Sequence, residues 1–147
     1  MFSQDFKEFV SLLNENNVSY LVVGGYAVGI HGHPRYTGDL DIWFLPETEN
    51  VIKLLNVLEL FGLGSMDIST EDLLMEGSII QIGYPPLRID LLNMIDGVNF
   101  TECFPNRKII EMEELKIPFI GFADLIKNKI ASGRHQDLGD IENLTLP

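Results

Sequence analysis

Three aspartates stand in or beside stretches of sequence that are typical of buried β-strands. Asp39 and Asp41 are separated by one residue at the start of the apolar run 40–44, and side chains two apart on a strand point to the same face. Asp90 lies in a second apolar run, 87–92. Ionised carboxylates in such surroundings are costly unless a cation neutralises them. Oxygen ligands of this kind suit Mg²⁺ or Mn²⁺, which would support in-line phosphoryl or nucleotidyl transfer.

A pair of glycines, Gly24 and Gly25, ends the apolar run 19–23. Without Cβ atoms they let backbone N–H groups approach a ligand, and a helix that follows them would direct its positive end at the same point. This arrangement suits a phosphate group. A glycine pair after a strand is more often a plain turn, and Asp-x-Asp alone is common on surfaces. The combination of the glycine pair, two strand aspartates after thirteen intervening residues and a later strand aspartate is more specific than either motif.

Hydrophobic periodicity and turn residues predict the elements that position these side chains. In order, they are helices over about 3–17, 26–31 and 48–62, strands over 19–23, 40–44, 79–82 and 87–92, a helical turn and a strand within 95–112, and helices over 121–132 and 134–144. Ser3 and Thr48 are the expected N-caps, and Gly133 separates the last two helices. The pattern predicts an α/β fold, a small mixed β-sheet flanked by helices with a short C-terminal helical tail. We expect one domain over 1–147, with a core of about 1–118 and a tail of about 119–147.

Composition narrows the class of protein. The 147 residues, 46% of them hydrophobic, suffice for one globular core. The apolar runs are far shorter than the ~20 residues that cross a bilayer, and the first residues lack the features of a signal peptide. A single cysteine, Cys103, excludes an intramolecular disulfide. We therefore expect a cytoplasmic protein that has no membrane partner.

The formal net charge of −12 argues against general binding of DNA or RNA, because such binding needs clustered Lys and Arg side chains. His31 and His33 flank Gly32, but no cysteine or third histidine stands near them in the sequence. Zinc binding by this pair is therefore not expected.

Several of these motifs carry a resemblance to a known family. The segments 23–28, 31–32 and 35–42 are similar to the signature of the DNA polymerase beta-like nucleotidyltransferase superfamily, in the style of small bacterial nucleotidyltransferases of the abortive-infection and toxin–antitoxin type. Residues 124–141 resemble the helical segment that ends those proteins. The resemblance covers most of 19–90 and 119–144 and implies the nucleotidyltransferase fold.

The resemblance implies a role for each residue of the motif. Gly24 and Gly25 would hold the triphosphate of a nucleotide, while Asp39 and Asp41 would ligate the metal ions. Asp90 would be the third metal ligand and the base for an acceptor hydroxyl. At the position of Gly25 many members of the superfamily carry a serine, so only the backbone can contact the phosphate here.

Weaker candidates surround this motif. Lys129 matches a lysine that the family directs toward the nucleotide, although a solvated helix lysine is the alternative interpretation. Arg35 and Thr37 precede the metal site and join the expected nucleotide-binding residues; Arg35 would neutralise phosphate charge or anchor its loop to nearby acids. Arg134 and Asp137, one helical turn apart, are expected to pair and fix the last helix.

Two further residues lie on the same strands as the acids. Arg88 is interpreted as a residue of the sheet surface near the acids. Trp43, two residues past Asp41, shares its face under strict alternation and either walls the site or packs beneath it.

The expected reaction is Mg²⁺- or Mn²⁺-dependent transfer of a nucleoside monophosphate from an NTP such as ATP to a hydroxyl or phosphate acceptor. The acceptor stays open among RNA, protein and a small molecule, and a homodimer or a partner protein would complete its binding site. The alternatives are a non-catalytic interaction module of a toxin–antitoxin pair and an antibiotic adenylyltransferase, whose acidic pocket would suit a cationic drug.

Overall fold

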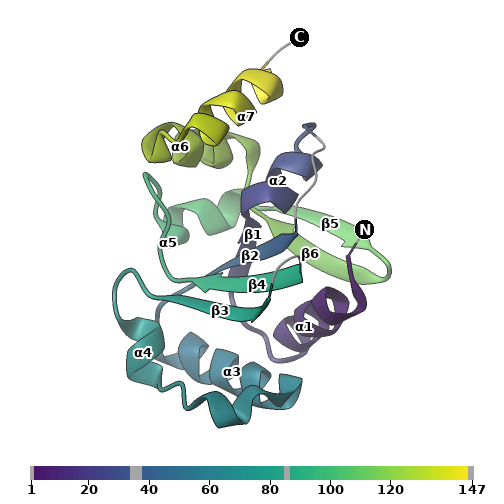
Figure 1. The fold of residues 1–147 in the computed structure, drawn as a ribbon, viewed down its shortest axis with the longest axis vertical. Coiled ribbons are helices and arrows are strands. Elements are labelled where there is room, and N and C mark those ends of the chain that lie inside the picture. Colours follow the sequence, from purple (N-terminus) through teal and green to yellow (C-terminus); the bar gives the residue numbers. More distant parts are fainter. Residues whose placement is uncertain (1, 34–37, 85–86, 146–147) are drawn as a thin grey trace.

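The computed structural model describes residues 2–33, 38–84 and 87–145. Its centre is a six-stranded sheet in the order β3-β4-β2-β1-β6-β5 (Figure 1). The strands are β1 Tyr20–Val23, β2 Asp39–Phe44, β3 Ile79–Tyr84, β4 Leu87–Leu92, β5 Lys108–Met112 and β6 Leu115–Phe119. The sheet is mixed, because β2 is antiparallel to β1 but parallel to β4, while β1 is parallel to β6. The predicted α/β architecture is confirmed.

Helices pack on both faces of this sheet. They are α1 Gln4–Glu15, α2 Gly24–Ile30, α3 Thr48–Leu58, α4 Thr70–Leu74, α5 Phe100–Cys103, α6 Phe122–Ser132 and α7 His135–Thr145. In Figure 1, α1, α3 and α4 lie below the sheet, and α2, α5, α6 and α7 lie above it. No helix within the described ranges is long and apolar enough to span a membrane.

Strand β2 separates the core from the face that carries chemistry. Leu40, Ile42 and Phe44 have no exposed surface and belong to the hydrophobic core. Because side chains alternate along a strand, Asp39 and Asp41 point to the opposite face. The alternation that the sequence shows therefore turns both aspartates toward α2.

Two predicted helix ends are confirmed. The Oγ of Ser3 accepts a hydrogen bond from the backbone N–H of Phe6 at 3.2 Å and caps α1. Gly133, with a φ of 62°, ends α6 in the left-handed conformation that glycine adopts without strain.

The predicted cap of the helix after β2 is wrong. Thr48 is the first helical residue of α3, and the N-cap is Glu47, whose side chain makes no capping hydrogen bond. Asn50 fixes this turn instead, because its Nδ2 donates to the carbonyls of Ser19 and Leu45 at 3.0 and 2.9 Å. The Asn50 side chain thus ties the start of α3 to the backbone at Ser19 and Leu45 without capping the helix.

The sequence missed one strand and one short helix. Residues 95–112 contain the helical turn and strand that were predicted, α5 and β5, but β6 was not expected. Its residues Lys116 and Pro118 are poor strand formers, and it is defined by antiparallel pairing with β5 and parallel contact with β1. The missed helix α4 begins at a capping box between Ser69 and Asp72.

Candidate active site

Strand register brings the three predicted acids together. In the parallel pair of β2 and β4, Asp41 lies opposite Asp90, and Asp39 lies opposite Arg88. Residues that pair across neighbouring strands point to the same face, and residues two apart on one strand do so too. One face of the sheet therefore carries three carboxylates and a guanidinium, which we call the acid cluster.

Arg88 lies between two of the acids on the face of the sheet. Its Nη2 is 3.1 Å from Asp39 Oδ2 and 3.1 Å from Asp90 Oδ2, and its Nε donates to Asp90 Oδ1 at 2.7 Å. Arg88 thus lies on the sheet surface as interpreted, with its side chain 24% exposed, but the interpretation missed its ion pairs with Asp39 and Asp90. The spacing of Arg88 and Asp90, two residues apart on one strand, is the sequence signal that could have found the pair with Asp90.

Asp41 shows that one guanidinium does not balance the cluster. Burial, followed by the charges of Asp90 and Asp39, raises the pKa of Asp41 from 3.8 to about 7, although the charge of Lys129 acts to lower it. Within the described residues no three acidic, histidine or cysteine side chains already form a metal-binding group. The carboxylate oxygens and their excess negative charge suit a divalent cation. In this structure, however, the three carboxylates do not yet converge on a single metal position.

Gly24 is required by the position of Asp41. Its φ of +68° lies in the left-handed region, and a Cβ at this position would lie 2.0 Å from Asp41 Oδ2. Any side chain here would therefore both strain the backbone and displace the carboxylate. Gly25 is buried in the first turn of α2, so the predicted glycine pair lies directly beside the acid cluster.

A second group of charges lies on α6 and α7, and we call it the tail cluster. Lys129 is 3% exposed, and its Nζ lies 2.8 Å from Asp137 Oδ1 and 3.3 Å from Asp140 Oδ2. Arg134 Nε lies 2.6 Å from Asp137 Oδ2, which confirms the predicted pair. Ser132 Oγ also donates to Asp137. Lys129 is therefore a buried, paired residue and not a solvated one.

The pKa of Asp137, in the tail cluster, is shifted in the opposite direction to that of Asp41. Burial by itself raises the pKa of Asp137, but hydrogen bonds from Arg134, Lys129 and Ser132 outweigh burial and hold the pKa well below its usual range. The negative charge of Asp137 is thus stabilised by the chain itself.

Two predicted nucleotide-binding residues, Arg35 and Thr37, lie outside the described residues. The histidines near them contact other elements. His31 Nε2 lies 2.7 Å from the carbonyl oxygen of Ile120, and His33 Nε2 lies 4.0 Å from Asp140 Oδ1. The end of α2 is thus tied to the segment after β6, and His33 lies beside the tail cluster.

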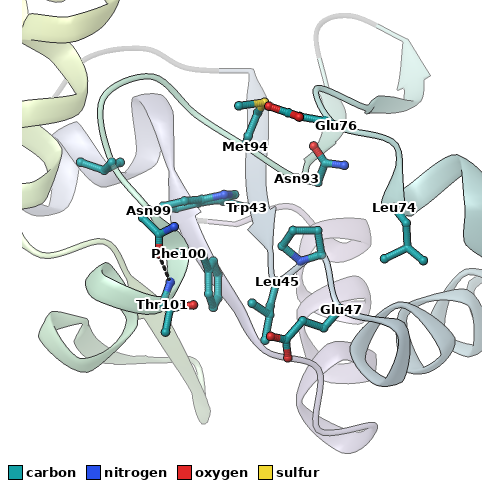
Figure 2. Close-up of a pocket in the computed structure, with 12 residues that line it drawn as sticks. Trp43, Leu45, Glu47, Leu74, Glu76, Asn93, Met94, Asn99, Phe100 and Thr101 are labelled. Atoms are coloured by element: carbon teal, nitrogen blue, oxygen red, sulfur yellow. Dashed lines mark hydrogen bonds between the residues drawn. The ribbon is translucent and has the colours of Figure 1, made fainter.

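Trp43 extends the face of the acid cluster along β2. It is 1% exposed, and its ring meets Phe100 edge to face with centroids 5.1 Å apart. Its indole nitrogen has no hydrogen-bond partner among the residues that the structure describes. Trp43 therefore packs in the core and also borders a pocket beyond the acids (Figure 2).

Comparisons with known proteins agree with this geometry. Residues 3–147 match the family model described as Nucleotidyltransferase of unknown function (DUF6036). None of the curated proteins compared with the chain matches it.

Solved structures share the fold at low sequence identity. A Thermotoga maritima protein described as a candidate nucleotidyltransferase has a TM-score of 0.61 at 14% identity, with 93% of this chain and 88% of that chain covered. Lincomycin-bound LnuA, a lincosamide antibiotic adenylyltransferase, has a TM-score of 0.55 at 17% identity, covering 98% and 96%. ANT(2'')-Ia in complex with adenylyl-2''-tobramycin has a TM-score of 0.57 at 12% identity, covering 95% and 84%. Such identities show the fold alone, which is the nucleotidyltransferase fold.

Proposed function

The chain belongs to the DUF6036 family of nucleotidyltransferases of unknown function, and from this premise we propose that it transfers a nucleoside monophosphate from an NTP to an acceptor in a divalent-metal-dependent reaction. The observation that carries the proposal is the contact between the two halves of the motif. Gly24 packs directly on the carboxylate of Asp41, and Asp41 lies opposite Asp90 in the sheet. A phosphate held by the glycine turn would therefore lie beside all three acids.

The acid cluster supplies the groups that such a transfer needs. The acceptor oxygen forms a bond to the α-phosphorus, the bond from this phosphorus to the bridging oxygen breaks, and pyrophosphate leaves with the electron pair. Asp90 takes the proton of an acceptor hydroxyl, and Arg88 orients the Asp90 carboxylate through its two hydrogen bonds.

The residues present fit a divalent cation at this site. Asp39, Asp41 and Asp90 would hold Mg²⁺ or Mn²⁺, which when bound would polarise the α-phosphate and neutralise its charge. The raised pKa of Asp41 supports the fit, because burial and the charges of Asp90 and Asp39 both disfavour its ionised form unless a cation neutralises it.

The triphosphate is proposed to lie on the backbone N–H groups of Gly24 and Gly25. Lys129, paired within the tail cluster, contributes positive charge, since its charge already lowers the pKa of Asp41. Arg35 and Thr37, which lie outside the described residues, remain proposed contacts of the nucleotide.

A small molecule is the class of acceptor that we favour. Of the fold neighbours, one is a lincosamide antibiotic adenylyltransferase and one was solved with an adenylylated tobramycin. The net charge of −12 supports the same class, because it disfavours a long nucleic-acid acceptor held by its phosphates. Adenylylation of a cationic antibiotic is therefore the second candidate function.

The test is a transfer assay with the full chain. The chain is incubated with Mg²⁺ and each NTP labelled at the α-phosphate, against tRNA, protein and a panel of aminoglycosides and lincosamides. We expect label on an acceptor, release of pyrophosphate, and loss of both in an Asp41→Asn chain. Absence of transfer with every acceptor would instead favour a non-catalytic interaction module, whose partner could be a second copy or the other half of a toxin–antitoxin pair.

A further inference from the structure

A pocket lies at the end of the sheet, where strands β2 and β4 end (Figure 2). It has a volume of about 360 Å³, within the range that holds small-molecule ligands. Its walls come from four segments: the end of β2, the turn after α4, the loop after β4 and the start of α5. We call it the Trp43 pocket, and its lining includes Trp43, Glu47, Leu74, Glu76, Met94 and Phe100.

Two asparagines hold the walls of this pocket in place. Asn93 Nδ2 donates to the carbonyls of Leu73 and Met75 at 3.0 and 2.6 Å, and Asn93 Oδ1 accepts from Gly77 N at 3.0 Å. These bonds fasten the segment that carries Glu76 to the end of β4. On the other side, Asn99 Oδ1 caps α5, which carries Phe100. The pocket is therefore built into the fold rather than left between loose loops.

The chemistry of the lining is aromatic and acidic. Trp43 and Phe100 form one wall, and the lining contains the carboxylates of Glu47 and Glu76 but no lysine or arginine. Within the described residues neither of these carboxylates forms an ion pair, and Glu47 makes no capping bond although it stands at the N-cap of α3. Aromatic faces and free carboxylates together favour a protonated amine on an apolar body.

The unpartnered nitrogen of Trp43 is an independent indication of a ligand. Buried indole N–H groups usually find a hydrogen-bond partner, and this one has none among the described residues. In Figure 2 the nitrogen-bearing end of the indole points toward the side of the pocket where Asn93 and Met94 lie. The amide of Asn93 is already engaged with the backbone of Leu73, Met75 and Gly77, so the indole N–H is left to donate to an oxygen of a bound molecule.

The pocket and the acid cluster share strand β2, which relates the pocket to the proposed reaction. Trp43 follows Asp41 by two residues on the same face of β2, a step of roughly 6–7 Å along a strand. A molecule of drug size seated against Trp43 could therefore extend a hydroxyl toward the acid cluster. We propose that the Trp43 pocket binds a small molecule that carries a protonated amine and an oxygen acceptor on an apolar body. In the proposed reaction this molecule is the acceptor that receives the nucleoside monophosphate. That assignment rests on the proposed function, whereas binding of the molecule in the pocket does not depend on it.

Trp43 is the one tryptophan of the chain, so its fluorescence reports the pocket directly. The full chain, without NTP or metal, is titrated with phenylethanolamine and with its neutral counterpart, phenylethylene glycol, while tryptophan emission is followed. The same titrations are repeated by calorimetry, so that binding is detected even if it does not change the tryptophan emission. We expect saturable binding of the amine, about tenfold tighter than binding of the glycol.

Charge variants locate the site. Glu47→Gln and Glu76→Gln should each weaken amine binding about three- to tenfold and leave glycol binding unchanged. Glu49→Gln makes the same charge change two residues from Glu47 but outside the lining, and it should bind the amine like the wild type.

Equal binding of amine and glycol, no saturable binding, or equal weakening by Glu49→Gln would each overturn the proposal. Because the titration contains no nucleotide, its failure leaves nucleotidyl transfer standing, and a chain without transfer activity can still bind the amine.

Discussion

The acid cluster and the tail cluster are both rich in aspartate, yet they treat their carboxylates in opposite ways. In the tail cluster, Lys129, Arg134 and Ser132 surround Asp137 and hold its pKa well below the usual range. In the acid cluster, burial and two neighbouring carboxylates raise the pKa of Asp41 to about 7. The guanidinium of this cluster, Arg88, pairs with Asp39 and Asp90.

The difference separates a structural role from a functional one. Charges that the chain balances internally stabilise the packing of α7 on α6, whereas charges that it leaves unbalanced provide binding energy for a cation from solution. The following predictions test this division, beginning with the largest expected effect.

Asp137→Asn should strongly destabilise the chain. Asp137 is 1% exposed, and its loss leaves the buried Lys129, among the residues that the structure describes, with Asp140 at 3.3 Å as its remaining ion-pair partner. Removing one partner of a buried ion pair costs about 3 kcal/mol or more. Urea denaturation measures the change, and Glu142→Gln, an exposed site on the same helix, is the matched control. A loss below about 0.5 kcal/mol, as at ordinary surface sites, would remove the structural role of the tail cluster.

Gly24→Ala should cost about 2 kcal/mol, because alanine is strained at a φ of +68° and its Cβ collides with Asp41. It should also abolish NTP binding, since the displaced carboxylate belongs to the proposed metal site. Gly29→Ala is the control on the same helix, where a Cβ meets nothing within 4 Å, and it should be neutral or slightly stabilising. Equal stability and NTP affinity for the two variants would contradict the close fit of Gly24 to the acid cluster.

Asp41→Asn should stabilise the metal-free chain at neutral pH, with a melting temperature about 2–4 °C higher. The folded state holds a proton on Asp41 more tightly than the unfolded state, because the pKa is raised from 3.8 to about 7. The contribution of Asp41 to stability is therefore lost as pH rises through this window. Thermal unfolding across the window should show a smaller decline for the asparagine variant than for the wild type. Parallel curves would mean that Asp41 is not the repelling member of the cluster.

Arg134→Ala should have the smallest effect, about 0.5–1 kcal/mol. The side chain of Arg134 is 76% exposed, so solvent screens its bond to Asp137 and Lys129 remains as the buried partner. Thermal unfolding beside Asp137→Asn measures the order of the two effects. A larger loss for Arg134→Ala than for Asp137→Asn would reverse the assignment of the buried pair as the centre of the tail cluster.

Much of the fold and the shared face of Asp39 and Asp41 could be predicted from the sequence, because both depend on local patterns. Alternation along β2 places Asp39 and Asp41 on one face, and the glycine pair marks the turn beside them. The strand β6 was missed, since Lys116 and Pro118 weaken its local signal and its parallel partner β1 lies far away in sequence. Its other partner, β5, is adjacent, but the turn between them is formed by Glu113 and Glu114 at positive φ and carries none of the usual turn residues. The position of β6 between β1 and β5 is known only from the structure of the sheet.

The charged residues divide in the same way. The pair of Arg134 and Asp137 follows from helical spacing and was predicted. The burial of Lys129 depends on how α7 packs against α6, and the bridge from Arg88 to Asp39 depends on the register of β2 and β4. Neither packing nor register between distant strands can be deduced from spacing along one element.

The central claim is that the acid cluster binds a nucleotide together with a divalent cation. Its most direct test is a calorimetric titration of the full chain with α,β-methylene ATP, with and without Mg²⁺, in the wild type and in Asp41→Asn. We predict that Mg²⁺ strengthens nucleotide binding at least about tenfold in the wild type and has no effect in the variant. Equal affinity with and without Mg²⁺ in the wild type, or an undiminished Mg²⁺ effect in the variant, would contradict the account.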